Sequence, residues 1–175
     1  MSATVKEPRP GRRLSVADCI TLVAVGVVVV LVSLPRLQVF AMRENETDAM
    51  GLLRLLGSRE LAADARAPHR IADLDLSDPA LQRRLRSLEV LADGRLFERY
   101  GYLFDLTGEG GDRSLRAWPR QWGETGRRAF VLGPGGGLWS HPNDDGRWEG
   151  RDQPPRGSWS EAEGWRPVPL DADYR

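Results

Sequence analysis

The side chains that usually perform catalysis are few in this sequence and form no catalytic pattern. The two histidines, His69 and His141, each lie beside a proline in an expected loop. No Gly-x-Ser-x-Gly sequence marks a nucleophile. The glycine-rich run 133–137 lacks the lysine of a phosphate-binding loop and predicts a hairpin turn instead. The sequence therefore predicts no enzymatic activity and no organic cofactor.

One acidic loop has the residue types of a metal site. Oxygen-bearing side chains gather in it at Asn143, Asp144, Asp145 and Glu149. Calcium favours carboxylate and carbonyl oxygens on a loop, so these four residues are calcium candidates. The alternative interpretation is an Asx-type turn, in which the side chains bond to the local backbone. The single cysteine, Cys19, lies in an apolar stretch, which excludes an intrachain disulfide and a Cys/His zinc site.

Six tryptophans suggest a second kind of chemistry, because flat indole rings stack on the apolar faces of sugars. They follow no fixed spacing, and core packing or loop anchoring explains them as well. If they do bind a ligand, the protein is a membrane-tethered extracytoplasmic module for a glycan or another envelope component. Nucleic acid is not an expected partner, because the 25 basic and 25 acidic residues leave no net charge.

Where the protein works, and so which of these functions it can have, depends on how its most apolar stretch is interpreted. Residues 19–35 carry no charge and as a helix would extend about 26 Å, close to the thickness of a hydrocarbon core. Basic residues precede this stretch, at Lys6, Arg9, Arg12 and Arg13. The positive-inside rule therefore places the N-terminus in the cytoplasm and the rest outside, with membrane lipid as a partner. A secretory signal cleaved after Ala41 is the alternative.

Asp18 is the informative residue of this stretch, because a carboxylate in an apolar helix has an energetic cost. It lies in the first turn of the predicted helix, where the helix dipole favours an anion. One interpretation is a boundary residue that reaches the lipid headgroups. The other is an acid whose cationic partner comes from another subunit.

The spacing of Leu14, Asp18 and Pro35 resembles the N-terminus of type IV pilins and type II secretion pseudopilins. That family has a basic leader, a cut before a hydrophobic residue, an acid in the first helical turn and often a later proline. The resemblance implies a structural subunit of the bacterial inner membrane with a periplasmic domain. Asp18 would pair with the free amine of a neighbouring pilin-like subunit, and Leu14 would be the new N-terminus.

One residue departs from the family pattern. The prepilin peptidase requires glycine before the cut, and Arg13 occupies that position. We therefore expect the chain to stay uncut or to be cut poorly. The order of the outer elements also resembles pseudopilin domains, loosely, so that the resemblance covers roughly residues 12–140.

Beyond the membrane stretch the sequence predicts an α+β fold, with a long N-terminal helix and a second helix packed on a small antiparallel sheet. One helical face is apolar at Ala49, Leu52, Leu53 and Leu56. The second helix is predicted from a cap at Ser77 or Asp78 to Gly94, with a leucine stripe at Leu81, Leu85, Leu88 and Leu91. Its arginines, Arg83, Arg84 and Arg86, indicate a solvated face.

Strands are predicted where the apolar period changes to two. Residues Tyr100, Tyr102, Phe104 and Leu106 alternate, and further short strands are expected at 115–118, 128–132 and 138–140. The predicted organisation is a leader (1–13), a membrane helix (14–42), its outward extension (43–67), an outer α+β domain (68–140) and tryptophan-, proline- and glycine-rich loops (141–175). Some of these loops are expected to pack on the sheet through their tryptophans.

Overall fold

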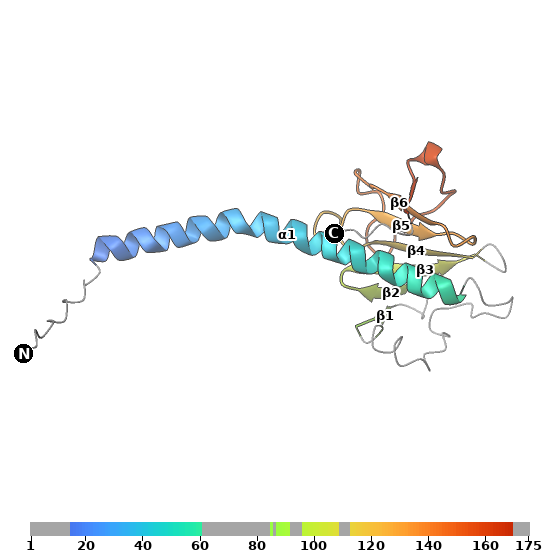
Figure 1. Cartoon of the computed structure of the whole chain (residues 1–175), viewed down its shortest axis with the longest axis horizontal. Helices are drawn as coiled ribbons and strands as arrows, with labels where there is room; N and C mark the ends of the chain where they lie inside the picture. Colours follow the sequence, from blue (N-terminus) through green and yellow to red (C-terminus); the bar gives the residue numbers. More distant parts are fainter. Residues whose placement is uncertain (1–14, 61–84, 86, 92–95, 109–112, 170–175) are drawn as a thin grey trace, which may run out of the picture. The chain divides into compact units, whose positions relative to one another are not determined.

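The computed structural model of the chain describes residues 15–60, 85, 87–91, 96–108 and 113–169, with the backbone alone at 58–60. One long helix, α1 (Val16–Glu60), comes first and continues through Pro35 (Figure 1). The chain divides into two units, residues up to Leu37 and residues from Gln38, so α1 contributes to both. Each unit is described in turn.

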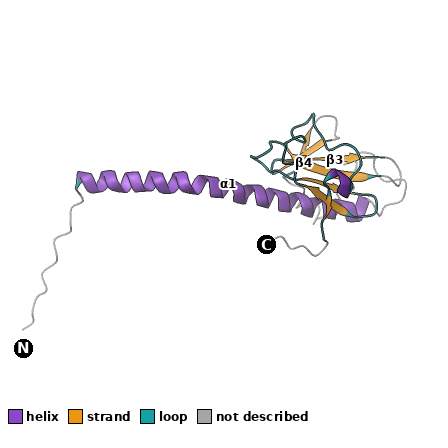
Figure 2. Ribbon diagram, turned by 90° about the horizontal axis from the view of Figure 1, so that it is seen from above, coloured by secondary structure: helices purple, strands orange, loops and turns teal. Residues whose placement is uncertain are grey.

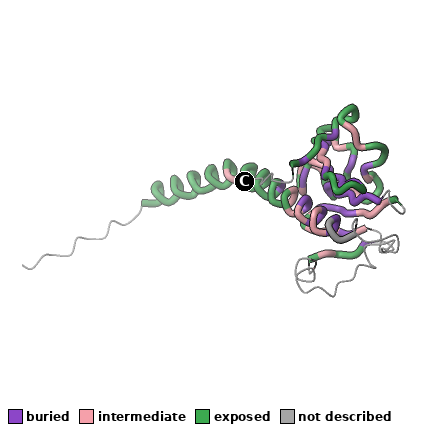
Figure 3. The backbone as a smooth tube through the Cα atoms, turned by 45° about the vertical axis from the view of Figure 1, so that its right-hand side comes forward, coloured by how far each residue is buried: buried purple, intermediate pink, exposed green. Residues whose placement is uncertain are grey.

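The part of α1 before Gln38 is apolar and uncovered. Every described side chain from Ser15 to Val32 is exposed, as the colouring of Figure 3 shows. Among the described residues, α1 is the one helix long and apolar enough to cross a membrane, although a signal sequence near an N-terminus would pass the same test. Lipid or other helices are the surroundings in which so much exposed apolar surface is stable.

The second unit is built on an antiparallel sheet of seven strands in the order of the chain. The strands are β1 (Glu89–Leu91), β2 (Leu96–Arg99), β3 (Tyr102–Thr107), β4 (Ser114–Pro119), β5 (Ala129–Leu132), β6 (Leu138–His141) and β7 (Arg166–Pro167). Each strand pairs only with its neighbours in sequence, and every pairing is antiparallel. Such local pairing forms readily because little loop entropy is lost.

One face of the sheet lies against the part of α1 that follows Gln38 (Figure 2). Leu53 is completely buried there, with Leu56 beside it, against Phe104 and Phe130 of β3 and β5. The predicted apolar face of the helix is therefore confirmed at Ala49, Leu52, Leu53 and Leu56, each at most 4% exposed. This burial fixes the helix to the sheet, since a fully buried leucine contributes about 2–3 kcal/mol.

Loops cover the opposite face of the sheet. Trp148 and Trp165 stack with ring centroids 5.1 Å apart, and both pack on Leu103 and Trp118. The predicted packing of the C-terminal loops through tryptophans is thus confirmed for two of them. The short 3-10 helix η4 (Glu161–Glu163) lies in this region between β6 and β7.

Two sequence-based expectations are corrected. Only part of the predicted second helix lies in the described ranges: residues 77–84, 86 and 92–94 lie outside them. Leu85 is helical, but Glu89–Leu91, before the predicted end at Gly94, is strand β1. Val90 and Leu91 are β-compatible, and pairing with β2 outweighs the helical spacing of the leucines. Tyr100 also leaves its predicted strand. It shares with Gly101 a two-residue turn in which both φ values are positive, 47° and 72°, as tight hairpins require.

Elsewhere the sequence-based strands hold. The three other expected strands appear as β4, β5 and β6, and the run 133–137 forms the predicted hairpin. Gly133 N–H donates to Gly137 O at 3.0 Å and Gly136 N–H donates to Gly133 O at 2.9 Å. The described extension of α1 ends at Glu60, within the predicted range 43–67.

Candidate functional sites

Asp18 forms a reciprocal cap at the start of α1. Its Oδ2 accepts hydrogen bonds from Ser15 N–H and Ser15 Oγ, both at 3.0 Å. Asp18 N–H in turn donates to Ser15 Oγ at 3.1 Å. This is the capping-box arrangement, in which two backbone donors at a helix start are satisfied by side chains. The carboxylate thus has a local role that the sequence pattern Ser-x-x-Asp already contained.

The other predicted assembly residues are placed only in part. Pro35 lies inside α1, which continues on both sides of it. Arg13 and Leu14, the residues around the expected cut, lie outside the described ranges. Cys19 is an exposed free thiol one residue after Asp18.

A row of polar side chains from Gln38 to Glu46 joins α1 to the loop 121–128. Gln38 Nε2 donates to Gly123 O at 3.2 Å, and Asn45 Nδ2 donates to Thr125 O at 2.9 Å. Glu46 Oε1 accepts from two successive backbone N–H groups, Arg127 at 3.0 Å and Arg128 at 3.3 Å. Local sequence patterns did not predict this attachment. Polar residues within 38–48 are compatible with hydrogen-bond partners beside this part of the helix, but the sequence does not say which loop supplies those partners.

The loop itself is tightly closed. Thr125 N–H and Oγ1 both donate to Gln121 O, and Gly123 N–H donates to Gly126 O at 2.8 Å. Gly126 packs against Tyr102, whose hydroxyl donates to Arg128 O at 2.9 Å. A Cβ at Gly126 would lie 2.2 Å from that hydroxyl oxygen, so only glycine fits.

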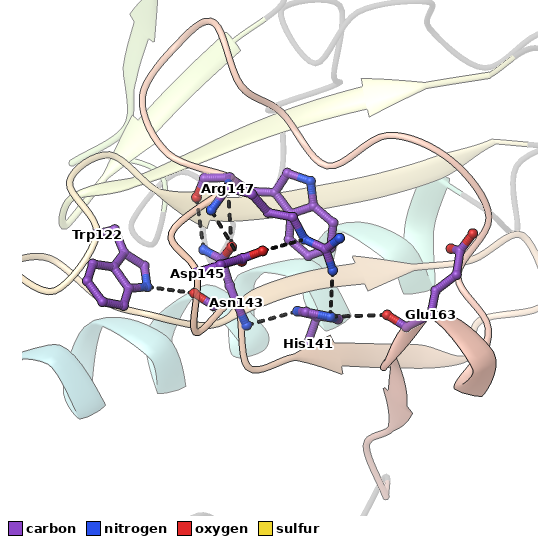
Figure 4. Close-up of polar contacts among 7 residues, drawn as sticks. Trp122, His141, Asn143, Asp145, Arg147 and Glu163 are labelled. Atoms are coloured by element: carbon purple, nitrogen blue, oxygen red, sulfur yellow. Dashed lines mark hydrogen bonds and ion pairs between the residues drawn. The ribbon is translucent and has the colours of Figure 1, made fainter.

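The four calcium candidates lie in the loop after β6, where most of their oxygens serve the fold, and Figure 4 shows two of them, Asn143 and Asp145. Asn143 is fully buried, accepts from Trp148 N–H at 3.2 Å and donates to Trp148 O at 3.0 Å. Asp145 forms an ion pair with Arg147, and Glu149 Oε2 accepts from Trp122 N–H at 3.1 Å.

The structure does not bring the candidate carboxylates together. Among the described residues there is no group of three or more His, Cys, Asp or Glu side chains placed to hold a metal ion, and Asp144, Asp145 and Glu149 form none. Asn143 has a positive φ of 52° and accepts Gly146 N–H at 3.0 Å through its carbonyl oxygen. Since Arg147 N–H also donates to Asp145 Oδ1, the arrangement is the turn that the sequence offered as the alternative.

His141 is the centre of the polar cluster in Figure 4. Its Nδ1 accepts Asn143 N–H at 2.8 Å, so its Nε2 carries the proton and donates to Glu163 O at 3.1 Å. Arg147 Nη2 lies 2.9 Å from Nε2. Burial lowers the pKa of His141 below its ordinary value of 6.5, and the Arg147 charge lowers it further, against weaker opposing effects of Glu163 O and of Asp145 and Asp144. The histidine therefore holds the loop as a neutral ring.

The tryptophans divide into two groups. Trp118, Trp148 and Trp165 are buried in the core on the loop-covered face, which removes their ring faces from any ligand. Trp122, Trp139 and Trp159 are half-buried. Trp122 is held by its indole N–H, which donates to Asn143 O at 2.7 Å.

Comparison with known proteins adds no assignment. No family model, curated protein or solved structure matches this chain.

Proposed function

We propose that this protein is a single-pass membrane subunit that assembles laterally through the first part of α1 and presents the sheet domain outside the cytoplasm. One observation carries the proposal. A single continuous helix joins an uncovered apolar stretch before Gln38 to a stretch whose apolar face is buried under a sheet. The closest functional analogy is the type IV pilin or type II secretion pseudopilin-like subunit, which the spacing of Leu14, Asp18 and Pro35 resembles.

The chemistry of the helix supports association with lipid and with other helices. Helices in membranes approach closely where small residues interrupt the larger ones, and Ala24 and Gly26 do so here. A Cβ at Gly26 would meet no atom within 4 Å inside the chain, so that position is open to a neighbouring helix. Its partners are then lipid and further copies of such helices, and its location is the bacterial inner membrane with the N-terminus inside.

The role of Asp18 can be separated from its capping role by substitution. Asp18→Gln keeps the capping box, because glutamine is also favoured at that position, but removes the charge that would meet a neighbouring subunit's amine. Ser15→Ala removes the cap and keeps the charge. If Asp18 fixes the register between subunits, Asp18→Gln lowers association while Ser15→Ala preserves it.

The measurement is energy transfer between subunits of the full chain in lipid vesicles. Dyes are attached at Arg156→Cys, an exposed loop position, in a Cys19→Ser background. We expect transfer above that of an unrelated single-pass helix at the same protein-to-lipid ratio. Transfer equal to that control would refute assembly and favour a simple tether, whose outer domain works on any anchor. Intact-mass analysis that shows a clean start at Leu14 would overturn the expectation that Arg13 impedes processing.

A further inference from the structure

Loop 121–128 lies at one end of the outer domain. It is bonded to α1 directly after the uncovered apolar stretch of that helix. Gln38, which bonds Gly123 O, is the first residue of the domain and follows Leu37 by one peptide bond. If about 20 residues from Cys19 onward cross the hydrocarbon, the span ends at Gln38. The covalent chain then brings Gly123 to the bilayer boundary for any orientation of the two units. Arg36 lies just before this level and can extend to the headgroups.

Within the domain, the attachment fixes where the whole loop lies along α1. Gln38 and Asn45 are seven residues apart in α1, about 10 Å along the helix axis, and they hold Gly123 and Thr125. The loop therefore runs beside the first two helical turns outside the hydrocarbon. The polar layers that flank the hydrocarbon core of about 30 Å are each roughly 5–8 Å thick. With the helix axis along the bilayer normal, the Gly123 end of the loop is then level with the headgroups and Thr125 lies near their outer edge.

The exposed side chains at this level are suited to such surroundings. Val39 and Phe40 remain 44% and 63% exposed, although they belong to the outer domain. Trp122 is half-buried and fixed by its bond to Asn143 O, and Arg127 lies over its ring at 5.7 Å. Tryptophan is enriched at membrane–water interfaces. Exposed apolar side chains also have a lower free energy there than in water, because less of their surface is hydrated.

We propose that loop 121–128, with Val39 and Phe40, rests in the headgroup layer and fixes the outer domain against the bilayer. This inference depends on the membrane span of the proposed function. Charge selects the lipid only weakly, because exposed Arg36, Arg43 and Arg127 exceed exposed Glu44 and Glu124 by a single positive charge. The occupant of this surface is accordingly the headgroup layer of a neutral bilayer.

The far end of the same domain supplies a control. Arg54 Nη2 donates to Pro169 O at 2.8 Å, and Val168 N–H donates to Leu138 O at 2.8 Å. The hairpin before Leu138 is thereby linked to a helix position 16 residues beyond Gln38, about 24 Å farther along the axis. Gly135 of that hairpin is exposed, and a Cβ there meets nothing within 4 Å.

The test uses the full chain in phosphatidylcholine vesicles with a fluorescent label on one cysteine, in the Cys19→Ser background. Gln121→Cys places the label on the loop at an exposed side chain, and Gly135→Cys places it on the hairpin. Val30→Cys labels the predicted span. We expect a headgroup-attached nitroxide lipid to quench the Gln121 label several-fold more than the Gly135 label, and an acyl-chain nitroxide to quench the Val30 label.

The outcomes distinguish the two proposals. Equal headgroup quenching at Gln121 and Gly135, with the Val30 label quenched from the acyl chains, would overturn the headgroup contact and leave the membrane anchor standing. No acyl-chain quenching at Val30 would overturn both. Asn45→Ala removes the bond to Thr125 and is expected to reduce the Gln121 quenching, which a loop held at that depth by other means would not show.

Discussion

Glu46 offers the most direct test of how α1 is joined to the sheet domain. Its carboxylate accepts two backbone N–H groups, Arg127 at 3.0 Å and Arg128 at 3.3 Å. In Glu46→Ala both donors lose this acceptor. Glu44, two residues earlier on the same helix, is exposed and provides a control with the same change in charge and helix propensity.

The magnitude follows from the kind of bond and its exposure. Hydrogen bonds to a charged group contribute about 1.5–3 kcal/mol each when buried. Water competes for one of the two here, because the Arg127 bond is exposed and only the Arg128 bond is partly buried. A total loss of about 2 kcal/mol is therefore expected, which corresponds to a fall in Tm of roughly 8 °C for a domain of this size.

Thermal unfolding of the full chain in detergent, followed by tryptophan fluorescence, measures this effect. Glu44→Ala should change Tm by no more than about 2 °C, since an exposed side chain contributes within about 0.5 kcal/mol. Glu46→Gln keeps an oxygen acceptor and should fall between the two. If Glu46→Ala and Glu44→Ala lower Tm equally, the loop is not held to α1 through this carboxylate.

Two further predictions concern the loops beside the sheet. Gly126→Ala should destabilise the domain by about 2–4 kcal/mol, because its Cβ would lie 2.2 Å from the hydroxyl oxygen of buried Tyr102. Gly123→Ala is the control: its φ is 77° but the space around it is open, so it should cost only about 1 kcal/mol. Equal losses of Tm in the two variants would contradict this packing. His141 has a pKa below 6.5 in the folded state, so the unfolded chain takes up a proton first as the pH falls. The contribution of neutral His141 to folding stability should therefore be complete above pH 6.5 and fall as the pH drops toward the lowered pKa. The Tm difference between wild type and His141→Gln should therefore shrink with acidification. His69 is present in both proteins, so it does not affect this difference. A difference that stays constant with pH would refute the stabilising role of neutral His141.

The sequence alone predicted the helix, its two halves and most of the sheet. The uncharged run 19–35 follows from composition alone, and the leucine face around Leu53 follows from local periodicity, which burial against the sheet then stabilises. The alternation in Tyr102–Leu106 and the glycine run 133–137 fix strands and turn by the same local logic. The Ser15–Asp18 cap was also readable, because its three-residue spacing is local.

Only the tertiary structure decided the partners of the polar residues. Glu46 meets Arg127 and Arg128 across some 80 residues of sequence, and no local pattern specifies such a pairing. The leucine spacing up to Leu91 predicted helix, yet pairing with β2 made Glu89–Leu91 a strand, because strand propensity depends on the neighbouring strand.

The candidate metal loop shows the same division. Asn143 and the acids after it have the residue types of a calcium loop, but ligand type does not determine where an oxygen points. Folding buried Asn143 under Trp148 and directed Glu149 to the Trp122 backbone, so their hydrogen bonds hold the loop. Residue type and local spacing were thus determined by the sequence, whereas long-range contacts decided which oxygens remain available.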